Sequence, residues 1–355
     1  MNAALTVIIA ILVFGFLIFI HEFGHYITAR IFKVSINEFS IGMGPRLLWY
    51  DSKRTGIRYS LAMLPIGGYV AMVGEDEASD DPNAFNKKPA WQRLIITVAG
   101  AAVNLIAGFL AMAVLALIVN IGTTTVHSAL TPEDFSSEDG IVFEGESASE
   151  KILPGDEIIR VNGKRVKILD ELSYEVMRHG DRPVDITVIR NGEEMTLSGV
   201  VFPKISREGQ TFGLLSCRVY GDYDKSLGDI ARYTVRRSAL AVRMVWESIF
   251  DLISGRYSLS AVSGPVGISG AIGEAANAGF SSLLNIVALI SINLGVMNLL
   301  PIPALDGGRI ITILFEIITR RRVPEKAERI INGTGLALLL LLSLVIMVKD
   351  VIQLF

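Results

Sequence analysis

The chain has 355 residues, of which 51 % are hydrophobic, and its mean hydropathy is +0.48. This hydropathy is high for a soluble globular protein and indicates a membrane protein with a polar insertion. The formal net charge of −3 gives no support for nucleic-acid binding. The single cysteine, Cys217, excludes an internal disulfide and a cysteine-cluster zinc site.

The first apolar stretch contains no charge from Ala3 to Ile20 and then reaches the motif His21-Glu22-x-x-His25. Ionisable side chains at membrane depth cost about 2.5–3.5 kcal/mol each, so they are rare and usually functional. On a helix, His21 and His25 project from one face a turn apart, which lets both imidazoles bind one zinc ion. Glu22 would lie beside that ion as the catalytic base for a bound water. The alternative, a hydrogen-bonded pair without metal, leaves the desolvation of these groups uncompensated.

A third metal ligand must come from elsewhere, because the other two of the 4 histidines, His127 and His179, lie in the polar middle of the chain. Zinc also accepts carboxylate oxygen, and Asp306 and Glu316 are the acidic candidates within the later apolar stretches. The backbone around Asp306 is predicted to be irregular, because of Pro301, Pro303, Gly307 and Gly308. Irregular backbone at membrane depth lines a cavity or is buried in protein. Glu316 is placed near the end of a regular helix, so Asp306 is the predicted ligand.

Four short motifs carry a resemblance to a known family. The two metal motifs are His21-Glu22-x-x-His25 and, later in the chain, Leu305-Asp306-Gly307. They are accompanied by Gly100-x-x-x-Asn104 and Asn298-x-x-Pro301-x-Pro303. Together they resemble the site-2 protease family of intramembrane zinc metalloproteases, and within it the bacterial RseP type, here with a single PDZ domain. The matched motifs run from near residue 20 to residue 309, so the resemblance covers essentially the whole chain.

This resemblance implies a zinc metalloendopeptidase that hydrolyses peptide bonds in or near transmembrane segments, with Zn2+ as its cofactor. Family members commonly act on single-span membrane proteins already trimmed by another protease. They release regulators such as anti-sigma factors, and some clear remnant signal peptides. The resemblance also implies that Asn298 offers its side-chain amide to the substrate, although capping of a helix break is the alternative role.

Two other classes of function compete with the protease. One is a catalytically inactive, membrane-anchored PDZ scaffold, in which the metal site is structural or lost. A structural zinc site usually has four protein ligands, and only three candidates can be identified here. The other is a transporter, which would also exploit a broken span but predicts inverted repeats, and the sequence shows none.

Four stretches are long enough to cross the hydrocarbon core, which takes about 20 residues. They are approximately 4–28, 94–121, 281–318, broken near Pro301, and 331–348. Basic residues follow the first span and precede the last: Arg30, Lys33, Arg46, Lys53, Arg54 and Arg58, then Arg320, Arg321, Arg322, Lys326 and Arg329. This bias predicts that both connections are cytoplasmic, with both termini and 122–280 outside. The resemblance implies the bacterial cytoplasmic membrane.

The connection between the first two spans is predicted to form strands over Ile57–Val73, where the glycines indicate a hairpin or a bend. In the family, similar sequence forms a re-entrant β-loop beside the active site. An exposed strand edge there can hold an extended substrate by main-chain hydrogen bonds. The predicted binding residues are Gly67, Gly68, Tyr69 and Val70. The alternative is a small cytoplasmic hairpin that only packs against the rest of the protein and does not bind substrate.

The polar insertion 123–205 combines a short strand from Ile141, a helix over 168–178, and a hairpin of Val184–Arg190 and Glu193–Val200. Its stretch Gly155-Asp156-x-Ile158-x-x-Val161-Asn162-Gly163 resembles a bacterial PDZ domain. Such domains bind extended peptides, here in a groove between the strand beginning near Gly140 and the helix. The segment 147–151 departs from the usual PDZ pattern, so a size-excluding plug is an equal alternative to a peptide receptor.

The segment 225–256 is predicted to be an amphipathic helix that lies on the outer membrane surface or packs under the PDZ-like domain. The predicted fold is a multi-span α-helical membrane protein with four transmembrane segments, a re-entrant or cytoplasmic β-hairpin region and an inserted α+β PDZ-like domain. Its predicted parts are 1–122, 123–205, 206–262 and 263–355. The expected partners are single-span membrane proteins and membrane lipid, with no nucleic acid.

Overall fold

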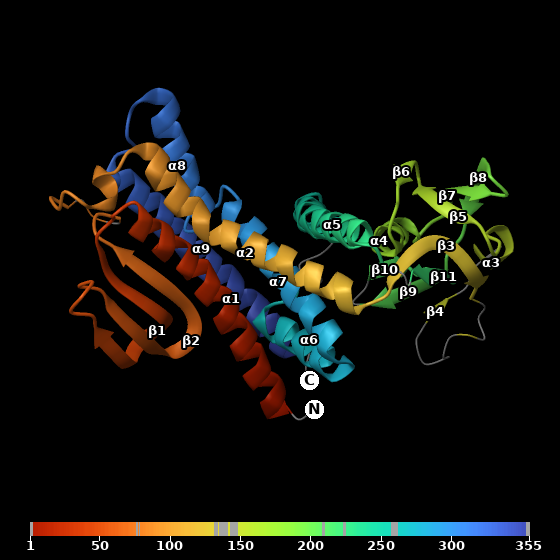
Figure 1. The fold of residues 1–355 in the computed structure, drawn as a ribbon, viewed down its shortest axis with the longest axis horizontal. Coiled ribbons are helices and arrows are strands. Elements are labelled where there is room, and N and C mark those ends of the chain that lie inside the picture. Colours follow the sequence, from red (N-terminus) through yellow and green to blue (C-terminus); the bar gives the residue numbers. More distant parts are fainter. Residues whose placement is uncertain are drawn as a thin grey trace. The chain divides into compact units, whose positions relative to one another are not determined.

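The computed structural model describes residues 3–75, 77, 79–130, 134, 141–142, 148–207, 210–222, 225–256 and 262–352. The chain forms two compact units, whose elements are labelled in Figure 1. Unit 1 comprises Met1–Met112, Met244–Ile249 and Val262–Phe355, and unit 2 comprises Ala113–Arg243 and Phe250–Ala261. An α+β region is therefore inserted into a helical one, as the sequence predicted. The finer division at 122, 205 and 262 stays a prediction.

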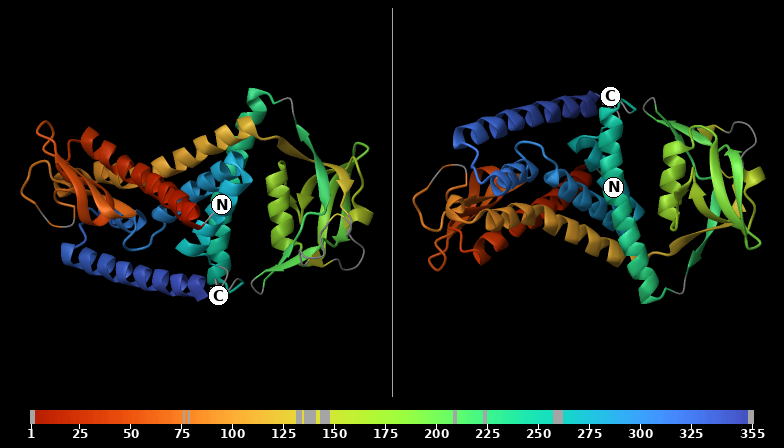
Figure 2. Two further views of the ribbon diagram at one scale, coloured as in Figure 1. Left: turned by 90° about the horizontal axis from the view of Figure 1, so that it is seen from below. Right: turned by 90° about the horizontal axis from the view of Figure 1, so that it is seen from above.

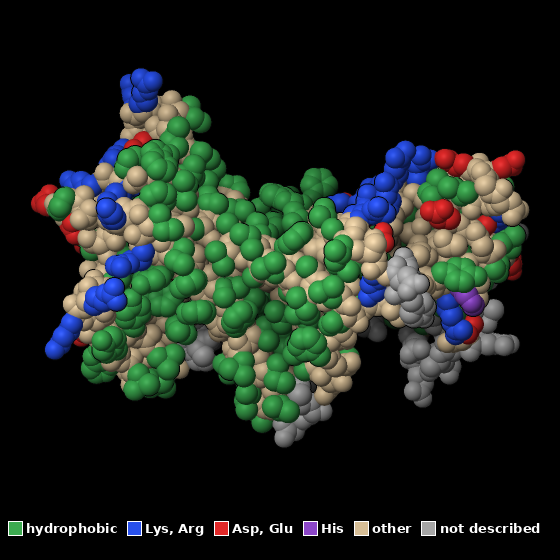
Figure 3. All heavy atoms as spheres, in the orientation of Figure 1, with side chains coloured by type: hydrophobic (Ala, Val, Ile, Leu, Met, Phe, Trp, Pro, Cys, Tyr) green, Lys and Arg blue, Asp and Glu red, His purple; other side chains and the backbone are tan. Residues whose placement is uncertain are grey.

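Unit 1 is built on long apolar helices. In the described part of the chain, four helices are long and apolar enough to cross a membrane: α1 (Ala3–Ile31), α2 (Ala90–Ile118), α7 (Phe280–Leu299) and α9 (Glu325–Ile352). The prediction of four spans is confirmed. Figure 3 shows hydrophobic side chains covering most of the visible face of unit 1, as contact with lipid requires.

The third predicted span is two helices with a break between them. Helix α7 ends at Leu299 and α8 (Asp306–Thr319) begins at Asp306, with Pro301 and Pro303 in the connection. Proline lacks the amide proton that a continuing helix needs, so the break falls where the sequence placed it. The shorter α6 (Pro265–Ala278) precedes α7, and a single 3-10 turn, η1 (Phe85–Lys87), precedes α2.

Glycines let these helices approach closely. A Cβ atom on Gly24 of α1 would lie 2.5 Å from the carbonyl oxygen of Ala99 on α2. A Cβ atom on Gly295 of α7 would lie 3.0 Å from the carbonyl oxygen of Ala101. Small residues at such positions allow backbones to pack directly, which is how helices associate in lipid. Helix α2 is thereby held between α1 and α7.

The connection between α1 and α2 forms a long antiparallel hairpin of β1 (Ile36–Asp51) and β2 (Arg58–Met72). The segment 38–41 pairs on one side with 68–71 and on the other with 58–61. Gly42, Gly44 and Gly67 adopt positive φ angles of 86°, 87° and 83°, which bend both strands between these pairings. The end of β2 therefore forms an edge, with β1 as its only strand partner among the described residues.

Two details of this region differ from the sequence prediction. The predicted pair of strands within Ile57–Val73 is one continuous strand, β2, and its partner β1 was not predicted. The first half of β1 is buried and its second half, with Leu48 and Trp49, is exposed, so it lacks the alternation by which a strand is recognised. The root of the hairpin packs with the end of α1 and the start of α2 through Ala29, Val34, Phe39, Val70, Phe85 and Ile96.

Unit 2 contains two antiparallel sheets and a small core. The larger sheet has the order β11 (Cys217–Asp222), β3 (Ile121–Ala129), β5 (Glu157–Val161), β7 (Val184–Arg190) and β8 (Glu193–Val200), with β6 (Lys164–Arg165) beside β5. The smaller has the order β10 (Gln210–Gly213), β9 (Lys204–Arg207) and β4 (Ile141–Val142). The helices are α3 (Ala148–Lys151), α4 (Leu169–His179) and most of α5 (Leu227–Ile253).

The predicted hairpin of unit 2 forms with the expected bounds, and Asn191-Gly192 makes its turn with φ angles of 54° and 86°. The strands β3, β9, β10 and β11 were not predicted. On the strand side of the predicted peptide groove, the strand near Gly140 is described over Ile141–Val142 as β4, and the residues on either side of it lie outside the described structure. Burial raises the pKa of the Cys217 thiol to about 11, which disfavours the thiolate that a nucleophilic cysteine needs.

Helix α5 is joined to α4 by ion pairs. Arg236 lies 3.1 Å from Glu171, Arg237 lies 2.9 Å from Asp170, and Arg243 lies 2.5 Å from Glu175. Asp251, near the end of α5, lies 2.7 Å from Arg178. Three arginines of α5 therefore pair with three acidic residues of α4. A position on the membrane surface for another face of α5, which exposes Val235 and Ile253, stays a prediction.

Candidate metal centre

Two side chains of α1 point at the same spot beside α2. His21 and His25 are both 8 % exposed, and their Nε2 atoms lie 3.3 Å apart. The Nδ1–H of His25 donates to the carbonyl oxygen of Ile96 at 2.8 Å. This bond leaves the lone pair of His25 Nε2 free to bind a cation, which is the usual arrangement of a metal-binding histidine.

The other imidazole is held by Asn104, for which the sequence alone predicts no role. Nδ2 of Asn104 lies 3.2 Å from Nδ1 of His21, and the fully buried Asn104 Oδ1 has no hydrogen-bond partner in the described structure. Metal binding through His21 Nε2 needs the proton on Nδ1, and an amide can present either its oxygen or its nitrogen there. The orientation that fits a bound metal has Oδ1 accepting this proton. The Gly100-x-x-x-Asn104 spacing is the sequence signal for this contact.

Glycines make room for both imidazoles. A Cβ atom on Gly100 would lie 2.3 Å from Nε2 of His25 and 2.9 Å from Cε1 of His21. No side chain larger than a hydrogen atom fits there without moving the rings. Because Gly24 meets Ala99 just as closely, α1 and α2 touch at the level of the two histidines. The glycine of the Gly100-x-x-x-Asn104 motif is therefore needed to leave space for the two imidazoles.

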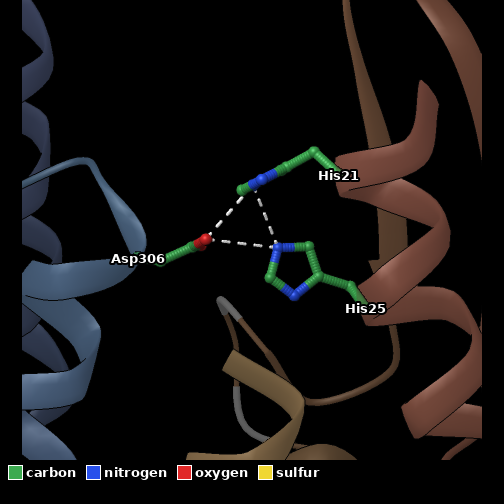
Figure 4. Close-up of side chains that lie close together, drawn as sticks. All are labelled: His21, His25 and Asp306. Atoms are coloured by element: carbon green, nitrogen blue, oxygen red, sulfur yellow. Dashed lines mark hydrogen bonds and ion pairs between the residues drawn. The ribbon is translucent and has the colours of Figure 1, made fainter. Parts of the chain in front are cut away.

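Asp306 reaches the histidines from the break between α7 and α8. It is the first residue of α8, where a negative charge is favoured by the helix dipole. The preceding turn is closed by the amide of Leu305, which donates to the carbonyl oxygen of Ile302 at 3.2 Å. Gly307 packs so tightly on this turn that a Cβ atom would overlap the carbonyl oxygen of Leu300. The predicted proline and glycine residues thereby direct the Asp306 carboxylate toward α1 (Figure 4).

The three side chains have the geometry of one tetrahedral metal site. Oδ2 of Asp306 lies 3.2 Å from Nε2 of His21 and 3.3 Å from Nε2 of His25, so the three atoms form a nearly equilateral triangle (Figure 4). Zinc binds nitrogen and oxygen at about 2.0–2.2 Å, which puts two tetrahedral ligands about 3.3–3.5 Å apart. Asp306 Oδ2 is also a buried polar atom without a hydrogen-bond partner in the described structure. The donor set therefore fits zinc and leaves its fourth position for a water molecule.

Glu22 lies beside this triangle in a polar cavity of about 640 Å³. The cavity is lined by His21, Glu22, His25 and Asp306 and by the end of β2, including Tyr69 and Val70. The carboxylate of Glu22 accepts a hydrogen bond from the Val70 amide. Gly68 packs against it, since a Cβ atom there would lie 3.1 Å from Glu22 Cγ. The predicted base, metal ligands and substrate strand thus meet in one cavity.

Not every predicted residue joins them. Asn298 is half-buried in α7 and is not among the residues that line this cavity. Gly67 faces the Met43 side chain rather than the cavity. Glu316, the rejected ligand candidate, lies in the last turns of α8 and pairs with Arg93 at 2.6 Å and Arg322 at 3.1 Å. Its carboxylate is thereby occupied by arginines, away from the histidines.

The sequence as a whole matches a family model. The model of peptidase family M50 matches residues 9–342. The chain belongs to peptidase family M50. An M50 member is an intramembrane zinc metalloprotease of the site-2 protease family, so the predicted class of enzyme and its cofactor, zinc, are confirmed. The family model does not include the predicted PDZ domain, which stays a prediction.

Individual M50 relatives extend over the full chain. A provisionally named zinc metalloprotease of Clostridium acetobutylicum is 36 % identical over 349 residues, covering 98 % of this chain and 97 % of the relative. A second such protein, from Fusobacterium nucleatum, is 36 % identical over 353 residues, covering 99 % and 100 %. The zinc metalloprotease RasP of Geobacillus kaustophilus is 29 % identical over 423 residues, covering 99 % and 98 %.

Proposed function

We propose that this M50 protease hydrolyses peptide bonds in or beside the transmembrane segments of single-span membrane proteins. The observation that carries the proposal is the edge of β2 at the cavity of the metal triad. Segment 68–72 pairs with β1 on one side, and Tyr69 and Val70 line the cavity that holds Glu22 and Asp306. A helical substrate hides its carbonyl groups in its own hydrogen bonds and must unwind before it is attacked. A free strand edge can replace those bonds with its own.

In the proposed reaction, each side chain of the site has a separate role. His21, His25 and Asp306 would hold the zinc ion, which lowers the pKa of a bound water and polarises the carbonyl group to be attacked. Glu22 accepts a proton from the attacking water and returns it to the leaving amine when the peptide bond breaks. The edge Gly67–Val70 aligns the unwound backbone. Asn298 is proposed as a further donor to the substrate, although it lies outside the cavity lining.

The biological setting belongs to the same proposal. The excess of basic residues in the hairpin and in the α8–α9 connection supports a cytoplasmic location for both, with unit 2 outside. Suitable substrates are proteins already trimmed by another protease, such as anti-sigma factors, or remnant signal peptides. Unit 2 would act as a PDZ-like peptide receptor or as a size filter for these substrates. A cysteine placed at Lys53 should react with a membrane-impermeant reagent only after permeabilisation, above the background of the buried Cys217.

The catalytic proposal is tested by a charge-neutral change at the base. Purified Glu22→Gln in detergent should retain zinc and lose cleavage of a peptide that contains a membrane segment, by about 10²-fold or more. The matched control is Glu77→Gln, because Glu77 lines the same cavity but is largely exposed, 3.6 Å from Arg329. Cleavage by Glu22→Gln at the parent rate would refute the assigned base. Zinc binding without cleavage by the parent would favour the inactive scaffold.

A further inference from the structure

Helix α9 touches the rest of unit 1 at few points. Of its residues whose burial is described, only Gly335 and Asp350 are buried. Figure 2 shows the helix as a separate rod along one side of unit 1. An exposed helix of this kind gains its place in lipid from a small number of close contacts. The two buried residues mark the places where α9 approaches the rest of unit 1 most closely.

The first contact is with the turn that precedes Asp306. A Cβ atom on Gly335 would lie 2.4 Å from Cβ of Pro303 and 2.9 Å from the Pro303 carbonyl oxygen. The helix backbone thus rests directly on the turn, and only glycine allows this approach. Beside the contact lies an apolar cavity of about 460 Å³ that both Pro303 and Gly335 line.

The next residue of that turn is strained. Ala304 has a φ angle of 72°, in the left-handed region that non-glycine residues rarely adopt. Such a conformation is unfavourable and persists only where its surroundings hold it. Its amide donates to Oδ1 of Asn332 on α9, at 3.4 Å. Asn332 and Gly335 lie one turn apart on α9, so a single face of the helix holds both Pro303 and Ala304.

The second contact fixes the other end of α9. Oδ2 of Asp350 accepts the amides of Gly264 and Gly267 at 2.9 Å and 3.0 Å, at the N-terminus of α6. Lys349 donates to the carbonyl oxygen of Val262 at 2.6 Å. A carboxylate at a helix N-terminus satisfies amides that lack a partner within the helix. Helix α9 therefore spans from the start of α6 to the turn that carries Asp306.

We propose that α9 is a positioning element for the third metal ligand. Gly335 and Asn332 hold Pro303 and Ala304 in the strained conformation from which Asp306 reaches His21 and His25, and Asp350 anchors the helix that does so. Gly335 and Asn332 contact Pro303 and Ala304 of the turn, so they act on Asp306 through the turn. The inference rests on the metal site of the proposed function.

The test compares two glycines of the same helix. Gly335→Ala should weaken zinc binding at least about 10-fold, the range found for residues that orient metal ligands. Gly333→Ala, two residues away, meets nothing within 4 Å and should leave zinc affinity unchanged. Zinc affinity is measured on full-length protein in detergent by competition with a chromophoric chelator. The absorption bands of the cobalt-substituted protein report whether the tetrahedral site is distorted, which a general loss of stability would not reproduce.

A second pair of variants keeps the test decisive if Gly335→Ala does not fold. Asn332→Ala removes the acceptor of the Ala304 amide and should weaken zinc binding, whereas Asn332→Asp keeps the acceptor and should restore it. Parent-like zinc affinity and cobalt spectra in both Gly335→Ala and Asn332→Ala would overturn the inference while leaving the protease intact. Failure of the parent to bind zinc would overturn both.

Discussion

The candidate metal centre has two halves that are built in different ways. The helical half-site, His21 and His25, lies on one face of α1, where the spacing of the residues alone sets the two imidazoles a turn apart. The loop half-site, Asp306, follows a turn with a left-handed alanine that is held by another helix. In the helical half-site, residues of α2 only leave space for the imidazoles and fix the position of a proton. In the loop half-site, residues of α9 hold the turn from which Asp306 approaches the histidines.

The largest effect is expected from removing one ligand of the helical half-site. Zinc sites contribute roughly 10–16 kcal/mol in small proteins, which amounts to about 3 kcal/mol for each of four ligands. His25→Ala should therefore lower zinc affinity about 10²-fold or more, and Asp306→Ala should do the same. Equilibrium dialysis against a zinc buffer measures both. If Asp306→Ala bound zinc as tightly as the parent, the loop half-site would not belong to the metal centre.

A smaller but still large effect is expected from filling the space between the imidazoles. Gly100→Ala places a methyl group 2.3 Å from His25 Nε2, so the rings must move and zinc affinity should fall on the order of 10²-fold. Gly15→Ala on α1 meets nothing within 4 Å and serves as the control. The comparison is made by chelator competition. Equal affinities in the two variants would show that the helical half-site adapts to lost space.

An intermediate effect is expected from the proton placement at His21. Asn104→Ala removes the partner of Nδ1 and should weaken zinc binding about 10- to 100-fold. Asn104→Asp should keep most of the affinity, because a carboxylate oxygen accepts the Nδ1 proton as the amide oxygen would. Metal titration of the two variants decides the point. Tight binding by Asn104→Ala and weak binding by Asn104→Asp would contradict this orientation of the amide.

The smallest effect is expected where the loop half-site stores strain. Ala304→Gly relieves the left-handed conformation but adds backbone entropy to the unfolded chain, and these terms leave a gain of about 0.5–1 kcal/mol. Thermal unfolding of the metal-free protein in detergent should shift upward by a few degrees at most. A downward shift would mean that the turn is not strained in the absence of metal.

The sequence predicted most accurately what depends on local periodicity. The four spans follow from uninterrupted apolar length, and the hairpin of β7 and β8 follows from alternation around Asn191-Gly192. Strand β1 was not predicted, because buried and exposed residues do not alternate along it. Its first half is buried and its second half, which carries Leu48 and Trp49, is exposed. Strands β3 and β11 were not predicted, because each is recognisable only through its pairing with the other.

The site shows the same division. His21, Glu22 and His25 belong to one helical turn and could be assigned from spacing, and Asp306 could be chosen because few acidic residues lie in apolar sequence. The position of Asn104 against His21 could not be derived, since it depends on how α2 packs on α1. The roles of Asn298 and Gly67 were inferred from the family, and the structure places both outside the cavity lining.

The sequence by itself determined that this protein spans a membrane with four apolar segments and carries a metal motif in the first. It did so because hydrophobic length and helical spacing are properties of neighbouring residues. Only the tertiary structure decided that Asp306 lies 3.2 Å from His21, that the edge of β2 meets Glu22, and that α9 supports the turn between α7 and α8. These contacts join segments distant in the chain, and only the packing of the helices and of the hairpin brings them together.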